Sequence, residues 1–137
     1  MSSYTYDVFI SYSHQDKEWV RMELLPRIEA ENLHVCIDYK DFKVGAPIVT
    51  EIELAILTSR KVLLIITPAY LESNWANFEK LMLQVLDPAN REQRLIPVLK
   101  SKCNVPLHIK YLTMVNFTES DDTDFVWTQL LTALGKT

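Results

Sequence analysis

The chain has 137 residues, 48% hydrophobic and 23% charged, with a formal net charge of −4. These values suit one soluble globular domain and give no basic surplus of the kind that nucleic-acid binders show. The longest apolar run, residues 62–66, is too short to cross a bilayer.

A buried strand is predicted over residues 7–12. Asp16 is expected to cap a helix that turns one apolar face to the core. Pro26 should bend or break this helix, and Asn32 is expected to be the left-handed residue that ends it. The predicted apolar face comprises Trp19, Met22, Leu25 and Ile28.

A second strand is predicted over residues 33–37, followed by a charged loop over 38–47. Pro47 should start a helix that bears Ile48, Ile52 and Ile56. The unbroken apolar run that follows predicts a strand over 62–67, covered on both faces.

Pro68 is expected to end that strand, and a helix should begin after Ser73 and stop at Asp87-Pro88. A fourth strand is predicted over 95–99, where Pro97 implies an edge or a bulge. Residues 100–111 read as irregular, 112–117 as a fifth strand, and a last helix starts at the acidic run 121–124. The predicted apolar positions of the two helices are Trp75, Phe78, Met82 and Val85, and then Val126, Leu130, Leu131 and Leu134, with Gly135 closing the second.

Five strands interleaved with helices indicate an α/β fold with a mostly parallel sheet. The chain has only two glycines, so it lacks a glycine-rich phosphate loop, and it contains no G-x-S-x-G elbow. A phosphoacceptor receiver domain is rejected, because the acids that it needs after strands one and three are missing. Cys36 and Cys103 are expected to be reduced thiols, and no pair of histidines, with or without a cysteine, has metal-ligand spacing, so no metal site is predicted.

Several segments, in this order, resemble the TIR (Toll/interleukin-1 receptor homology) family, and the similarity extends from Tyr6 to about Leu134. Between Asp87 and Pro106 the chain looks more like bacterial members than animal receptors. The matching segments are Tyr6 to Tyr12 (YDVFISY), Cys36 to Gly45 (CIDYKDFKVG), 59–68, the W-x-x-x-E pair Trp75 and Glu79, 94–99 and Phe117.

This resemblance implies a flavodoxin-like three-layer fold with strand order 2-1-3-4-5 and a ligand-binding switch point between strands one and three. It implies one cytoplasmic TIR domain over residues 1–137, with a core of about 5–135. TIR domains usually belong to longer proteins, so these residues could be a part of one.

Members of the family do two different things. Many bacterial and plant members cleave NAD⁺ at the nicotinamide–ribose bond, and some cyclise the ADP-ribose, whereas animal receptors and adaptors mostly assemble with each other. By resemblance, Glu79 is the catalytic residue of an NADase in immune or stress signalling, with NAD⁺ as substrate and no cofactor. The predicted substrate-binding residues are Ser11, Tyr12, Ser13, Asp38, Tyr39, Phe42 and Trp75.

One carboxylate suffices for this chemistry. Ordinary glycosidases use two, one of them to protonate the leaving oxygen. Nicotinamide in NAD⁺ is already cationic and leaves as a neutral base, so Glu79 need only orient the ribose and stabilise an oxocarbenium-like charge. Trp75 lies one turn earlier on the same helix face and could stack on a ring.

Other interpretations stay open. Glu79 could be a solvated helix residue, Trp75 a core residue and Asp38 a turn cap. The whole chain could be an interaction module without chemistry, or a nucleotide sensor without turnover.

Residues 38–47 match the family's BB loop, which covers the pocket and mediates contacts between TIR domains. Val44 stands where many receptors carry proline, so receptor-like signalling specificity is not implied. Activity is expected to need assembly into a homo-oligomer or filament, with no nucleic acid and no membrane insertion involved. The predicted self-association residues are Lys40, Asp41, Lys43, Val44 and Gly45.

Overall fold

A parallel five-stranded sheet forms the middle layer of the protein. The computed structural model describes residues 4–85, 93–119 and 121–135, with side chains as far as Met82 in the first range. The strand order is β2-β1-β3-β4-β5, and every neighbouring pair is parallel. The predicted fold class and strand order are therefore confirmed. The strands are β1 (Tyr6–Ser11), β2 (Val35–Cys36), β3 (Ser59–Ile66), β4 (Leu95–Leu99) and β5 (Val115–Asn116).

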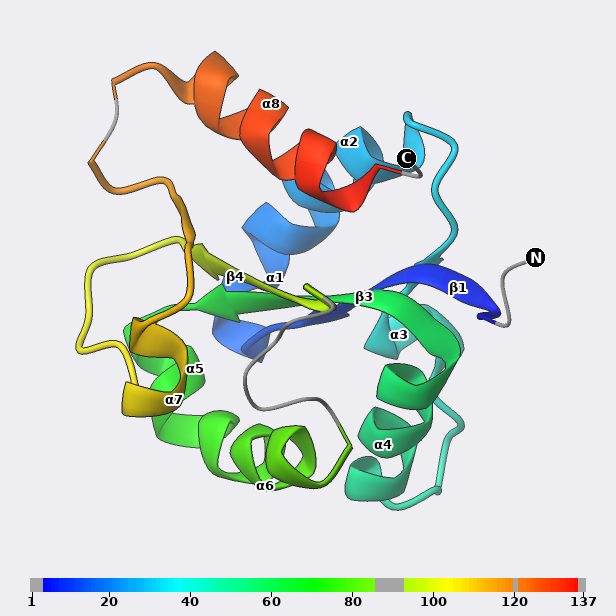
Figure 1. Cartoon of the computed structure of the whole chain (residues 1–137). Helices are drawn as coiled ribbons and strands as arrows, with labels where there is room; N and C mark the ends of the chain where they lie inside the picture. Colours follow the sequence, from blue (N-terminus) through cyan, green and yellow to red (C-terminus); the bar gives the residue numbers. More distant parts are fainter. Residues whose placement is uncertain (1–3, 86–92, 120, 136–137) are drawn as a thin grey trace.

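Helices cover both faces of the sheet (Figure 1). One face carries α1 (Lys17–Trp19), a π turn (Val20–Leu24), α2 (Leu25–Glu29) and α8 (Thr123–Leu134). The other face carries α4 (Ile48–Thr58), α5 (Pro68–Ser73), α6 (Trp75–Val85) and α7 (Leu107–Lys110), while the short α3 (Asp38–Asp41) follows β2. No helix of the described residues is long and apolar enough to span a membrane.

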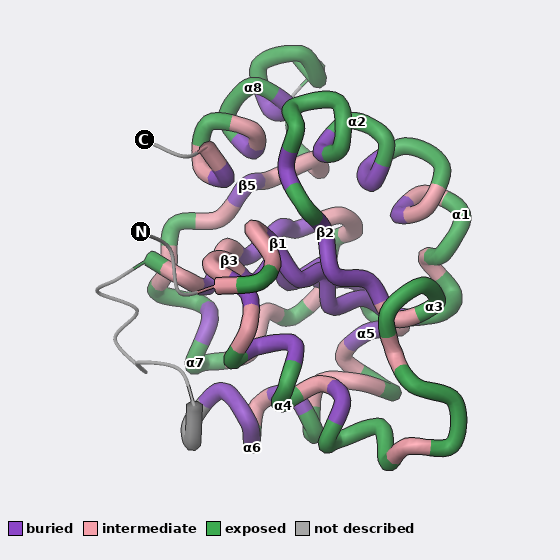
Figure 2. Tube along the Cα trace, turned by 90° about the vertical axis from the view of Figure 1, so that its right-hand side faces the viewer, coloured by how far each residue is buried: buried purple, intermediate pink, exposed green. Residues whose placement is uncertain are grey.

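The central strand supplies both halves of the core. Leu63 and Ile65 belong to the cluster under α2 and α8, whereas Leu64 and Ile66 belong to the cluster above α4 and α6. All four are at most 1% exposed, as the strand prediction for an apolar run covered on both faces required. Figure 2 shows this buried sheet between layers of exposed helix faces.

The helix that contains Pro26 differs from its prediction. The expected distortion is a π turn, in which the Leu25 N–H donates to the Val20 carbonyl. Pro26 has no N–H to donate, and the π turn lets the helix continue past it without a break. The wider turn rotates Met22 outward, and Met22 is 72% exposed instead of packed in the core. Asn32 has the predicted left-handed conformation, with φ 60°.

Asp16 lies at the N-cap position of α1, as predicted, but its side chain makes no capping hydrogen bond. Ser13 caps the preceding 3-10 turn (His14–Asp16) by accepting from the Gln15 N–H. Asp16 instead accepts a 2.7 Å bond from the Thr67 hydroxyl, and Thr67 caps α5 by accepting from the Tyr70 N–H at 3.1 Å.

Three further boundaries need correction. The loop predicted over 38–47 begins with α3, the segment predicted as irregular over 100–111 contains α7, and α5 precedes α6 where only a strand end was predicted. The second and fifth strands are two residues long rather than five and six. The predicted helix stop at Asp87-Pro88 lies outside the described residues.

Pro97 pairs with Leu64 of β3 but has no strand beside it on the side of β4 that faces β5. β5 pairs only with Val98 and Leu99, so the preceding residues of β4 form a local sheet edge. An edge is where a strand tolerates a residue without an N–H, and the predicted edge position is confirmed.

Arg60, at the start of β3, links the ends of two other elements. Its guanidinium donates to the carbonyls of Leu134 and Gly135, at 2.5 and 3.3 Å, and lies 3.9 Å from the Asp7 carboxylate at the start of β1. The C-terminal end of α8 is therefore held at the edge of the sheet where β1 and β3 begin.

Candidate functional site

Tyr12 and Asp38 meet where β1 and β2 end, beside the predicted switch point between β1 and β3. The Tyr12 hydroxyl donates to Asp38 Oδ1 at 2.6 Å, and the Tyr39 N–H donates to the same oxygen at 2.7 Å. Burial, reinforced by the bond to the Asp38 carboxylate, raises the pKa of Tyr12 above its usual value of 10.0. Tyr12 is therefore a neutral donor at physiological pH, and Asp38 is a fixed acceptor.

Arg21 joins this pair, although no sequence motif predicts it. Its Nε donates to the Tyr12 hydroxyl at 3.0 Å, and its guanidinium lies 4.2 Å from the centre of the Tyr39 ring. Arg21 belongs to the π turn, nine residues after Tyr12 in sequence. Only the packing of that helix against the sheet brings it to Tyr12, so no local sequence pattern could have indicated it.

The hydroxyls of Ser11 and Ser13 are occupied by structural hydrogen bonds. Ser11 Oγ lies 2.8 Å from the hydroxyl of Tyr70, whose side chain is fully buried. Ser13 Oγ accepts from the Gln15 N–H, and Ser13 is 2% exposed. In this arrangement both residues shape the end of β1, and neither presents a free hydroxyl.

A small cavity lies at the switch point. Its volume is about 60 Å³, far below the roughly 300–1,000 Å³ of typical ligand pockets. A dinucleotide would therefore need the surrounding loops to open, or a second chain to extend the site. We call this space the switch-point cavity; its lining includes Phe9, Ser11, Tyr12, Asp38, Phe42, Ile48 and Asn74.

Trp75 and Glu79 lie one turn apart on α6, beyond Asn74. The Trp75 ring is partly buried against the core cluster on the α4 and α6 face of the sheet, and its centre lies 6.2 Å from the centre of the Phe78 ring. The Glu79 side chain is 35% exposed, and its Oε2 lies 2.9 Å from His108 Nδ1 on α7. Among the described residues, no hydrogen bond joins Glu79 to Ser11, Tyr12, Ser13 or Asp38. The predicted site residues thus form two groups: those at the ends of β1 and β2, and the pair Trp75 and Glu79 on α6. Asn74, which lines the switch-point cavity, directly precedes Trp75 in sequence.

The first half of the BB loop is anchored at two points. At its start, Asp41 Oδ2 accepts from the Ile37 N–H at 2.8 Å. Further on, Glu51 of α4, which is 7% exposed, accepts from the Lys43 N–H at 2.5 Å. The two predicted residues Lys40 and Asp41 belong to α3 rather than to an irregular loop.

The tip of the BB loop projects from the protein. Val44 is fully exposed, and Gly45 has φ +87°, a conformation that glycine adopts without strain. Near the start of the loop, Lys40 Nζ lies 3.9 Å from the Glu29 carboxylate and over the Tyr39 ring. An apolar tip on a fixed base is a geometry suited to contact with another protein.

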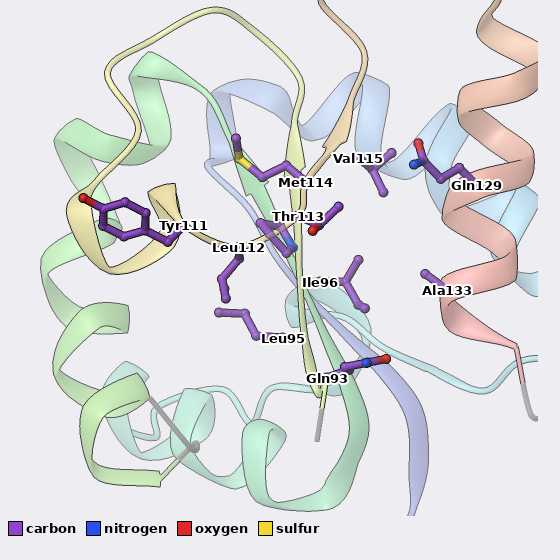
Figure 3. Close-up of a pocket in the computed structure, with 11 residues that line it drawn as sticks. Gln93, Leu95, Ile96, Tyr111, Leu112, Thr113, Met114, Val115, Gln129 and Ala133 are labelled. Atoms are coloured by element: carbon purple, nitrogen blue, oxygen red, sulfur yellow. The ribbon is translucent and has the colours of Figure 1, made fainter. Parts of the chain in front are cut away.

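A larger cavity, of about 420 Å³, lies at the opposite end of the sheet, between β4, β5 and α8 (Figure 3). None of the predicted site residues lines it. In the part of the chain that the structure describes, no three His, Cys, Asp or Glu side chains are grouped as metal ligands, and both cysteines are free thiols.

The comparisons with known proteins agree with the fold. Residues 8–131 match the family model described as TIR domain. Among curated proteins, the chain is similar to Toll-like receptor 4 of Pinctada imbricata, with 30% identity over 131 residues that cover 86% of the chain and 15% of the receptor. It is also similar to Toll-like receptor 6 of Bos taurus, with 35% identity over 74 residues, 54% of the chain and 9% of the receptor.

Among solved structures, the TIR domain of a Toll-related receptor from Hydra magnipapillata superimposes with a TM-score of 0.81 and 25% identity. The match covers 95% of this chain and 98% of that one. The chain spans less than a fifth of the length of the two curated receptors. All three are animal proteins, and the assignment to a bacterial-type member stays a prediction.

Proposed function

The chain belongs to the TIR-domain family, and from this premise we propose that it cleaves the nicotinamide–ribose bond of NAD⁺. Glu79 is the catalytic carboxylate in this proposal. The observation that carries it is the state of Glu79 on α6, one turn after Trp75: one carboxylate oxygen is bonded to His108, and the other has no partner among the described residues. A partly exposed carboxylate held in this way has an oxygen available for a ribose hydroxyl.

The reaction needs little more from the protein. The bond between ribose C1′ and the nicotinamide nitrogen breaks, and its electron pair leaves with nicotinamide, which becomes neutral. Glu79 stabilises the positive charge that develops on the ribose. Water then adds at C1′ and loses a proton, which gives ADP-ribose; attack by an adenine nitrogen of the same molecule gives a cyclic isomer instead.

The remaining predicted residues have supporting roles in this proposal. Tyr12, Asp38 and Phe42 line the switch-point cavity, and Trp75 forms a wall beside Glu79. Ser11 and Ser13 maintain the end of β1, and Tyr39 lies at the rim with Arg21.

Assembly completes the site in this proposal. The switch-point cavity of one chain is too small for a dinucleotide, and in this proposal the substrate binds where chains meet. The exposed tip of the BB loop, Val44 and Gly45, is the proposed contact with a neighbouring TIR domain. We place this activity in cytoplasmic immune or stress signalling and expect the isolated domain to be weakly active in dilute solution.

A second candidate function is a signalling module that only binds other TIR domains. The similarity to Toll-like receptors favours it, and so does the anchored BB loop. Fold alone does not choose between the two functions.

Nicotinamide release from NAD⁺, followed by chromatography, separates them. The domain is concentrated on beads, and wild type is compared with Glu79→Gln, which keeps the size of the side chain and removes its charge. We expect the variant to lose at least about a hundredfold in rate. Glu72→Gln, on the exposed surface of α5, is the matched control and should release nicotinamide at the wild-type rate.

Equal rates for wild type and Glu79→Gln would refute the enzymatic role of Glu79. If clustered wild type releases no nicotinamide, the interaction module becomes the better account, and self-association of Val44→Glu would be tested next. NAD⁺ binding without release would indicate a nucleotide sensor.

A further inference from the structure

We propose that His108 is a positioning residue for the Glu79 carboxylate, an inference that rests on the proposed function. The two side chains come from different elements, α6 and α7, and lie 29 residues apart in sequence. His108 Nδ1 is 2.9 Å from Glu79 Oε2, an ordinary distance for an N–H donated to a carboxylate.

The backbones that carry both residues are fixed. Phe78, next to Glu79, is 1% exposed, and Ile109, next to His108, is fully buried. Both belong to the same core cluster. α7 is further tied to its own start by a 2.8 Å bond from the Lys110 N–H to the Pro106 carbonyl. The contact therefore joins two anchored positions rather than two mobile ones.

The contact also fixes the hydrogen-bonding roles of His108 Nδ1 and of the two Glu79 carboxylate oxygens. A carboxylate only accepts hydrogen bonds, so Nδ1 of His108 must carry a hydrogen. Glu79 Oε2 is then held, while Oε1 has no partner among the described residues and can meet the substrate. Fixing a long side chain in one rotamer before the reaction removes an ordering cost from the transition state.

No second side-chain donor duplicates this role in the described residues. Lys80 and Lys110, the exposed lysines next to the pair in sequence, form no hydrogen bond or ion pair with either side chain. Within the part of the chain that the structure describes, only His108 holds the carboxylate, so its removal should free Glu79 to rotate.

The test compares substitutions at His108 in the clustered domain. His108→Ala should lower kcat for nicotinamide release about tenfold and change KM less than about twofold, because the lost interaction serves the transition state. His108→Asn places an amide nitrogen near the position of Nδ1 and should restore most of kcat. His108→Gln places its amide further out and should restore less. Lys110→Ala, on the same short helix, is the matched control.

Nitrogen NMR of the histidine ring gives a readout that does not depend on turnover. Where the ring is neutral, the contact requires His108 Nδ1 to be the protonated, pyrrole-type nitrogen. Glu79→Ala removes the acceptor and should shift the hydrogen to Nε2. His14, which is exposed, should not respond.

The outcomes separate this proposal from the function on which it rests. A pyridine-type Nδ1 in wild type, or an unchanged or higher kcat in His108→Ala while Glu79→Gln is inactive, overturns positioning and leaves the enzyme intact. If Glu79→Gln is as active as wild type, the proposed function fails, and the role of His108 fails with it.

Discussion

Replacing Tyr70 with phenylalanine should destabilise the protein through a single buried hydrogen bond. The Tyr70 side chain is fully buried, its hydroxyl lies 2.8 Å from Ser11 Oγ, and Ser11 is 9% exposed. The variant loses a bond worth about 1 kcal/mol net and leaves Ser11 Oγ without its partner at the end of β1, which adds about another 1 kcal/mol. We expect the free energy of unfolding to fall by about 2 kcal/mol, and Tm by roughly 6–10 °C for a domain of this size.

Urea denaturation followed by tryptophan fluorescence measures this change, and a double-mutant cycle isolates the bond. Ser11→Ala leaves the Tyr70 hydroxyl buried and unpaired, so it should cost a similar amount. The double variant replaces both partners with apolar groups and should cost less than the sum of the singles by about 2 kcal/mol. Additive single effects, or a loss below about 0.5 kcal/mol for Tyr70→Phe, would show that this bond does not fix the end of β1.

Two further predictions concern the BB loop and the thiols. Glu51→Ala should lower the free energy of unfolding by about 1–3 kcal/mol and speed amide exchange over residues 42–46, because the Lys43 N–H loses its acceptor. Glu51→Gln keeps an acceptor, so its loss of stability and its increase in exchange should be smaller. Equal exchange rates in wild type and the two variants would contradict the anchoring role of Glu51. Burial, with the nearby Asp41 carboxylate adding to it, raises the pKa of Cys36 from 9.0 to about 12. Between these values the folded protein binds more protons than the unfolded chain, so this contribution to stability is complete below about pH 9 and falls as pH rises toward 12. Native Cys36 should therefore resist an aromatic disulfide reagent near pH 9 while the half-buried Cys103 reacts first, and equal labelling rates would refute the assignment.

The architecture was predictable where the sequence signal is local and strong. The short apolar run in β3 indicates a strand buried on both faces, and the helices on either side of it follow from apolar spacing. The strand order came from the family resemblance. The short strands β2 and β5 were overestimated, because apolar residues beside a strand also pack in the core without pairing.

The missed helix α5 begins where a strand ends. Thr67-Pro68 was interpreted only as the end of a strand, although threonine as N-cap and proline in the first turn are equally a helix start. The structure uses them in both ways at once. Met22 was misplaced because the spacing of an ordinary helix does not include the π turn before Pro26.

The candidate site was predictable residue by residue but not as contacts. Tyr12 and Glu79 were identified from their motifs, yet Arg21 and His108, which bond to them, lie outside every motif. These partners are brought together by packing between elements, which a pattern within one element cannot report. For the same reason, the division of the site into two groups emerges only in three dimensions.

The links that Arg60 makes bear on how the domain can be tethered. Arg60 holds the end of α8 beside the start of β1, so residues 4 and 135 leave the domain on one side, while β3 runs toward α5 and α7 on the other (Figure 1). A bead, a membrane or a second domain attached at either end would thus be opposite the helix that carries His108. Immobilisation through either end leaves that surface open to solvent and to neighbouring copies, and both ends are suitable handles for raising the local concentration.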